Sequence, residues 1–139
     1  MNADIVTGDA LVWQPTELYD TILLDAPCTA TGTCRRHPDV LHRIAAPQIA
    51  EMAELQDTML TRASSWLAPG GRLIYAVCSL EAEEGEARVA TVALTLDPIR
   101  AVELPAGLLP TSQGTLRTDP GMLADSGGMD GFFIARWTA

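Results

Sequence analysis

Two short apolar runs, separated by one long helical pattern, constrain the fold of this 139-residue chain more than any other feature. Residues 21–24 and 72–76 are apolar, short and bounded by polar residues, which predicts two buried strands. Between them, apolar residues recur at three- and four-residue steps from Pro47 to Leu67. This spacing predicts an amphipathic helix, which begins at Pro47 and is stopped by the prolyl-diglycine at 69–71. Strand, helix and strand in this order predict a parallel pair in an α/β sheet.

Weaker patterns extend this core in both directions. Residues 4–6 predict a first strand that ends near Asp9, and the acidic run from Glu81 opens a predicted second helix that reaches Leu96 before Pro98. Three short strands are predicted in the remaining chain, at residues 101–104, 114–117 and 131–137. The whole chain therefore predicts one α/β domain, a doubly wound but partial Rossmann-like sheet with an antiparallel carboxyl-terminal hairpin.

Composition limits the environment and the partners. The residues are 47% hydrophobic and 19% charged, which is typical of a single globular domain. No apolar stretch reaches the ~18–20 residues of a membrane span and no secretion signal is recognisable, so a cytoplasmic protein with three free thiols is expected. The net charge of −9 argues against nucleic-acid binding by the overall field. Any RNA contact must be local, and Arg35, Arg36 and His37 form the candidate patch.

Two cysteines follow the two predicted buried strands. Asp25, Pro27 and Cys28 come directly after the first, and Cys78 comes directly after the second. Ligands of open α/β sheets bind outside the carboxyl ends of the strands, so two thiols are expected to meet in one cleft. Asp9 is expected at the same edge, although a Gly-Asp-Ala turn can equally be only a turn. The chain has no lysine, which excludes a lysine-dependent mechanism within it.

Five ordered motifs resemble the Sun-type RNA cytosine-5 methyltransferases, a family that uses S-adenosylmethionine. The resemblance spans nearly the whole chain. The motifs are residues 25–33 (DAPCTATGT), residues 35–39 (RRHPD), the helix positions Gln56 and Leu60, residues 69–86 around Cys78, and residues 127–135 (GGMDGFFIA).

The resemblance implies a role for each candidate residue. Cys78 would be the nucleophile that adds to carbon 6 of a target cytosine, and Cys28 would assist the later elimination. Asp25 would hold the cytosine edge, while Asp9, Asp25 and Pro27 would contact the cofactor. The resemblance implies RNA, of the ribosomal class, as the partner. Its use of a thiol agrees with the need for an activated nucleophile.

The sequence departs from the family pattern in two ways. Val77 stands where the family usually has threonine before its nucleophile. The glycine-rich cofactor loop is not found, since the glycine pairs at 70–71 and 127–128 do not open a helix after a strand. Residues 1–139 are therefore expected to be the carboxyl-terminal part of a methyltransferase catalytic domain, with an exposed sheet edge through which copies could associate.

Two other functions stay open at this point. A truncated chain without cofactor residues could bind RNA or a protein partner without catalysis, and would expose apolar surface where the missing strands pair. A DNA cytosine methyltransferase would use the cysteine after the proline, Cys28, as its nucleophile. The presence of Cys78 in a second motif favours RNA, and comparing the two cysteine variants would separate these alternatives.

Overall fold

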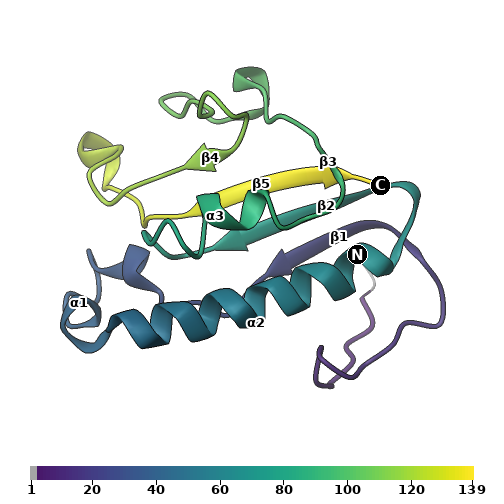
Figure 1. The fold of residues 1–139 in the computed structure, drawn as a ribbon. Coiled ribbons are helices and arrows are strands. Elements are labelled where there is room, and N and C mark those ends of the chain that lie inside the picture. Colours follow the sequence, from purple (N-terminus) through teal and green to yellow (C-terminus); the bar gives the residue numbers. More distant parts are fainter. Residues whose placement is uncertain (1–2) are drawn as a thin grey trace.

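A computed structural model, which describes residues 3–139, confirms the predicted strand, helix and strand. Strand β1 (Tyr19–Asp25) and strand β2 (Leu67–Val77) are adjacent and parallel, with Asp25 paired to Ala76 near their carboxyl ends. Helix α2 (Ala46–Ser65) connects them and lies along one face of the sheet (Figure 1). Both strands therefore deliver the following residues, including the two cysteines, to the same edge of the sheet.

The junction between α2 and β2 differs slightly from the prediction. The helix ends at Ser65, and Leu67 already pairs with Tyr19 in the sheet. The next pair in the ladder is Thr21 with Arg72, so the register shifts between the two pairs. The four residues of β2 between Leu67 and Arg72 bulge out of the ladder. The prolyl-diglycine segment that was expected only to stop the helix is thus part of a strand.

An antiparallel strand at the carboxyl end of the chain completes the centre of the sheet. Strand β5 (Phe133–Thr138) pairs with β2 along its whole length, and its other edge pairs with two short strands, β3 (Thr95–Leu96) and β4 (Leu116–Arg117). The strand order is β1-β2-β5-β3, with β4 also on β5. The expected open α/β sheet with an antiparallel carboxyl-terminal hairpin is confirmed.

The main core lies between the sheet and α2. Side chains alternate along β2 and β5, so that every second residue is fully buried against the helix. The short helix α3 (Glu86–Val89) lies on the same face and is joined to α2 by an ion pair between Arg88 and Asp57. The residues of this core include Leu60 and Ala63 of α2, Leu73, Tyr75 and Val77 of β2, and Phe133, Ala135 and Trp137 of β5.

The opposite face of the sheet is covered only in part. A smaller apolar cluster, built on Ile99, Leu108 and Leu116, packs against Ile134 of β5. Strand β1 is the last strand of the sheet, and Leu23 on it is 66% exposed. The predicted exposed sheet edge is therefore present at β1, whereas self-association through it stays a prediction.

Three weaker predictions of secondary structure are wrong. Residues 4–6 form no strand: no strand of the described residues pairs with them, and Ile5 is 93% exposed. The second helix shortens to α3, because Thr95–Leu96 instead pairs with β5 as β3. Residues 101–103 form a 3-10 turn in which the Glu103 carboxylate caps the backbone N–H of Arg100. The loop before α2 also contains a short helix, α1 (Val40–Arg43).

Among residues 3–139, no helix is long and apolar enough to cross a membrane.

Candidate active site

The two cysteines that follow β1 and β2 lie in direct contact. The Sγ atoms of Cys28 and Cys78 are 3.5 Å apart, and both residues are half-buried free thiols. Cys78 comes directly after β2, while Cys28 lies three residues beyond β1 on the loop that the parallel pairing places beside it. The predicted meeting of two thiols at the carboxyl edge of the sheet is confirmed.

The contact makes the two thiols chemically different. The hydrogen bond from the Cys28 thiol lowers the pKa of Cys78 to about 7, against the opposing effects of burial and of the Asp25 charge. The same hydrogen bond, together with burial, raises the pKa of Cys28 far above its ordinary value. Near neutral pH a substantial share of the pairs therefore holds a Cys78 thiolate that accepts a hydrogen bond from a neutral Cys28. A partly exposed thiolate is the reactive form of cysteine.

Asp25 and Pro27 occupy the turn between β1 and Cys28. Asp25 is exposed, and no hydrogen bond or ion pair within residues 3–139 engages its carboxylate. Pro27 contributes its carbonyl oxygen, which accepts a 2.9 Å hydrogen bond from Gln56 Nε2 on α2. The charge of the Asp25 carboxylate opposes the lowering of the Cys78 pKa. An acceptor of this kind can bind an amino group beside the thiolate.

A buried carboxylate connects the loops that carry the two cysteines. Glu84 is fully buried, and its carboxylate accepts hydrogen bonds from the Thr29 backbone N–H at 2.9 Å, the Thr29 hydroxyl, Ser79 Oγ at 2.9 Å and Gln56 Nε2 at 2.9 Å. Its backbone carbonyl accepts a further bond from the Tyr75 hydroxyl at 2.7 Å. Four side-chain and backbone donors thus converge on one acidic group behind the cysteine pair.

Sequence reasoning did not identify this network. Glu84 belongs to an acidic run that predicts the first turn of a helix, and nothing in the composition of the run distinguishes it from Glu83, which is exposed. Gln56 stands in the apolar stripe of α2 and is completely buried. A polar residue at a core position of an amphipathic helix is a sequence signal for a buried polar partner, and Gln56 and the segment that contains Glu84 also belong to the motifs of the family resemblance.

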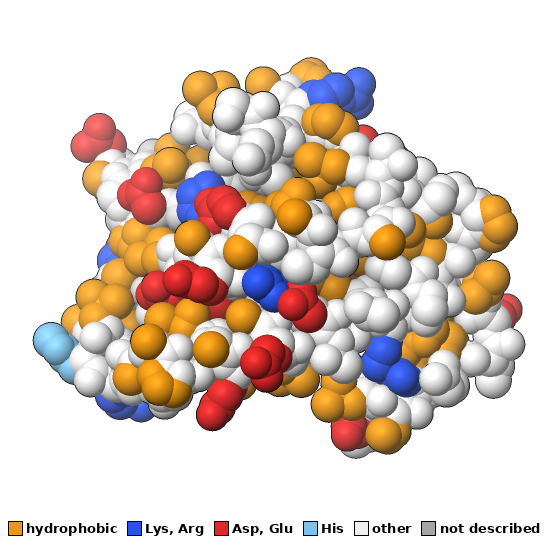
Figure 2. Space-filling model, viewed as in Figure 1, with side chains coloured by type: hydrophobic (Ala, Val, Ile, Leu, Met, Phe, Trp, Pro, Cys, Tyr) orange, Lys and Arg blue, Asp and Glu red, His pale blue; other side chains and the backbone are white. Residues whose placement is uncertain are grey.

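The predicted basic patch lies beside the same edge. Arg35, Arg36 and His37 are exposed, but Arg36 makes a bidentate ion pair with Asp130, and Arg35 lies 3.8 Å from the same carboxylate. Asp130 precedes β5, so the pair joins the loop after Cys28 to the segment 119–130. Figure 2 shows acidic side chains over the face that carries α2 and α3, with fewer arginines among them. Of the predicted basic patch, Arg36 is thus engaged by an acidic partner, and His37 is exposed.

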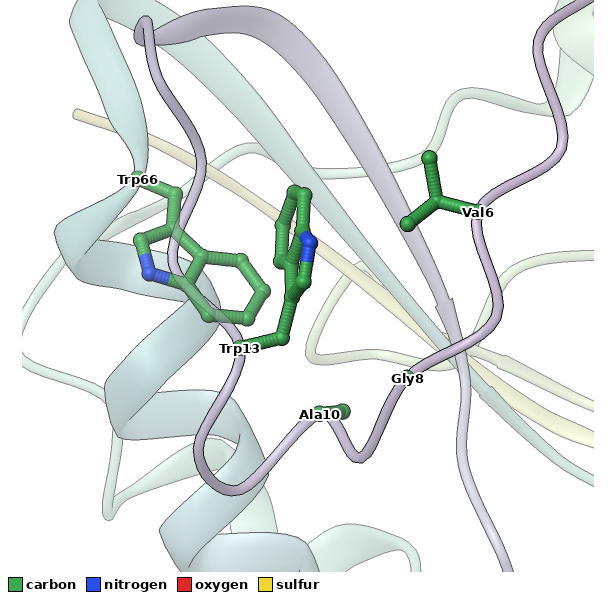
Figure 3. A pocket seen from close by; sticks show the side chains of 5 residues that line it. All are labelled: Val6, Gly8, Ala10, Trp13 and Trp66. Carbon is green, nitrogen blue, oxygen red and sulfur yellow. The ribbon is translucent and has the colours of Figure 1, made fainter.

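Asp9 is not brought to the cysteine pair. Its side chain accepts a 2.8 Å hydrogen bond from the Leu11 N–H, and the following turn is held by Arg62, which donates to the carbonyls of Ala10 and Trp13. This turn lies beside the last turns of α2, where Trp13 packs edge-on against Trp66 at 5.4 Å. Figure 3 shows these two rings in an apolar pocket of about 220 Å³, which Val6, Gly8 and Ala10 complete. The turn-forming alternative for Asp9 agrees with this geometry.

Cys34 has no part in the pair. It is half-buried and lies after the 3-10 turn at Thr31–Thr33, where its N–H donates to the Thr31 carbonyl. Within the described residues, no cluster of three histidine, cysteine or acidic side chains could hold a metal ion.

The open α/β sheet with reactive groups beyond the carboxyl ends of its strands matches the Rossmann-like methyltransferase domains of known structure. The crystal structure of NSun6 from Pyrococcus horikoshii with SFG superposes on it with a TM-score of 0.80 at 30% identity, over 99% of this chain and 34% of that chain. The sequence model described as "16S rRNA methyltransferase RsmB/F" matches residues 1–138. The chain belongs to this family.

The chain is also similar to curated proteins named ribosomal RNA small subunit methyltransferase B. The ribosomal RNA small subunit methyltransferase B of Shewanella oneidensis is 39% identical over 142 residues, which cover 98% of this chain and 31% of the relative. The protein of that name from Klebsiella pneumoniae is 41% identical over 140 residues, which cover 98% and 30%. The chain therefore spans about a third of the length of the curated relatives it matches.

Proposed function

We propose that this chain supplies the base-handling part of an S-adenosylmethionine-dependent enzyme that methylates carbon 5 of cytosine in ribosomal RNA. The single observation that supports this most strongly is the Cys28–Cys78 pair, with sulfurs 3.5 Å apart at the ends of adjacent parallel strands. Membership of a ribosomal RNA methyltransferase family supports the RNA substrate. The free carboxylate of Asp25 supports recognition of an amino group such as that of cytosine.

The chemistry follows from the different states of the two thiols. The Cys78 thiolate forms a bond to carbon 6 of the cytosine, which makes carbon 5 electron-rich, and Asp25 binds the amino edge of the ring. After methyl transfer, elimination passes the carbon 5 proton to a water molecule, and its bonding electrons form the 5,6 double bond while the bond between sulfur and carbon 6 breaks, so that Cys78 leaves as a thiolate. Cys28, which stays neutral, stabilises the departing thiolate by its S–H hydrogen bond. The lowered pKa of Cys78 favours it, rather than Cys28, as the nucleophile.

S-adenosylmethionine would supply an electrophilic methyl group at this site. Asp25 is suited to bind this cofactor, because its exposed carboxylate has free acceptor positions at the carboxyl end of β1. Pro27 shapes the adjoining turn, whose carbonyl is held by Gln56. Asp9 fits less well, because one of its carboxylate oxygens already caps the Leu11 N–H. The described residues therefore account for one side of a cofactor site.

Trapping of the covalent adduct tests this proposal. The chain, and a chimaera in which it replaces the matching segment of the Shewanella relative, are incubated with S-adenosylmethionine and ribosomal RNA that contains 5-fluorocytidine. The fluorine blocks the final elimination, so a denaturant-stable protein–RNA adduct is expected, and Cys78→Ala should abolish it while Cys34→Ala should not. Adduct formation through Cys28 in the Cys78→Ala protein would contradict the assignment. A folded chimaera that binds cofactor and RNA without forming an adduct would favour the non-catalytic alternative.

A further inference from the structure

The buried carboxylate of Glu84 holds the residue that follows each cysteine. Thr29, next to Cys28, donates both its backbone N–H and its hydroxyl to this group, and Ser79, next to Cys78, donates its hydroxyl at 2.9 Å. The two hydroxyls also lie 3.3 Å from each other. The Glu84 carboxylate therefore joins the two loops at the residue directly after each cysteine.

The surroundings of Glu84 make this junction rigid. Glu84, Thr29, Ser79 and Gln56 are all buried, and the amide of Gln56 donates to both the Glu84 carboxylate and the Pro27 carbonyl. Removing an acceptor from such a network leaves several buried donors without a partner, which is more costly than losing an exposed hydrogen bond. Small displacements of either loop are accordingly resisted by the same group.

We propose that Glu84 is a positioning residue, which sets the spacing between Cys28 and Cys78 and thereby keeps Cys78 reactive. Its part in catalysis rests on the function proposed above, but its effect on the thiols does not. Glu84 touches neither sulfur; it holds their spacing through Thr29 and Ser79, and its charge also contributes to the raised pKa of Cys28. A weak S–H donor loses its hydrogen bond when the sulfurs separate, and Cys78 then returns toward the behaviour of an isolated thiol.

The size of the effect follows from the acidity of Cys78. With its pKa at about 7, roughly half of Cys78 is thiolate at pH 7, whereas at the ordinary value of 9.0 about one hundredth would be. A more basic thiolate is also more nucleophilic, with a Brønsted coefficient of about 0.4–0.5, which recovers a factor of roughly eight. Loss of the contact should therefore slow alkylation of Cys78 about sixfold at pH 7.

The test measures the thiols of the full 139-residue chain and requires no methyl transfer. Glu84→Gln is compared with Glu83→Gln, which makes the same change at the exposed neighbouring position. Iodoacetamide labelling is followed from pH 5 to pH 10 by mass spectrometry of tryptic peptides. Because the chain lacks lysine, trypsin releases Cys78 in the peptide 73–88, separate from Cys28 and Cys34. The rate of disulfide formation with diamide, which takes two hydrogens from the two thiols, reports their spacing.

The expected result is specific to Glu84. In Glu84→Gln the pH midpoint for Cys78 labelling should rise, labelling at pH 7 should slow about sixfold, and disulfide formation should slow, whereas Glu83→Gln should match the unmodified chain. If Glu84→Gln does not fold by circular dichroism, Thr29→Val decides the question, because it removes one hydroxyl donor and should shift the profile in the same direction. Thr29→Ser, which keeps a hydroxyl, should restore it.

A folded Glu84→Gln or Thr29→Val protein with unchanged labelling and disulfide rates would overturn the proposal. Failure of the proposed methyl transfer would leave these rates unaffected, so the two outcomes are distinguishable.

Discussion

Replacing Gly32 by alanine should destabilise the chain by about 3 kcal/mol, because no side chain fits there. A Cβ at Gly32 would lie 2.0 Å from the Gly131 carbonyl oxygen and 2.9 Å from that of Cys78. Ordinary carbon–oxygen contacts are about 3.3 Å or longer, so the segments must separate by roughly 1.3 Å. That movement disrupts two hydrogen bonds, from Gly131 N–H to the Gly32 carbonyl and from Gly32 N–H to the Cys78 carbonyl. Their loss and the overpacking together give about 3 kcal/mol.

Urea denaturation followed by circular dichroism measures this cost, with Gly70→Ala as the matched control. Gly70 has a φ of 75° and no atom within 4 Å of an added Cβ, so its replacement carries only a backbone penalty of about 1 kcal/mol. Both substitutions restrict the unfolded chain equally, which cancels in the comparison. Gly32→Ala should be less stable than Gly70→Ala by about 2 kcal/mol. Equal stabilities, within about 0.5 kcal/mol, would refute the packing argument at the cysteine loop.

Three further predictions concern charge. Cys28→Ala should raise the pKa of Cys78 above about 7, because the S–H donor is lost, and the pH midpoint of iodoacetamide labelling should rise with it; an unchanged midpoint would contradict the pairing. Asp130→Asn should free Arg36 and strengthen RNA binding in filter assays at low salt, with a steeper salt dependence than the unmodified chain shows. The hydrogen bond from the Arg100 backbone N–H lowers the pKa of Glu103 to about 2, so the Glu103 carboxylate should stabilise the fold fully above pH 4.5 and lose this stabilisation as the pH falls toward 2. Titration of the Glu103 carboxyl resonance by NMR measures this pKa, and a midpoint near 4.5 would contradict the prediction.

The central elements were predictable because their signals are local. The apolar runs before Cys28 and Cys78 and the three- and four-residue spacing after Pro47 need no distant partner to be recognised. The structure confirms them as β1, β2 and α2. The weak predictions at residues 4–6 and 101–104 failed because a short strand is stable only beside another strand, and the sequence near it does not state whether one is present. Pairing with β5 likewise decided that Thr95–Leu96 is a strand and not the end of a helix.

The sequence by itself determined the chemical groups of the site and their order: a carboxylate, a proline and a thiol after one strand, and a second thiol after the next. Only the tertiary structure decided how they act. The parallel pairing of β1 and β2 sets two thiols 50 positions apart at 3.5 Å, and this contact separates their pKa values. Folding also buries Glu84 while leaving Glu83 in solvent, a difference between adjacent identical residues that depends on the direction of each side chain relative to the core.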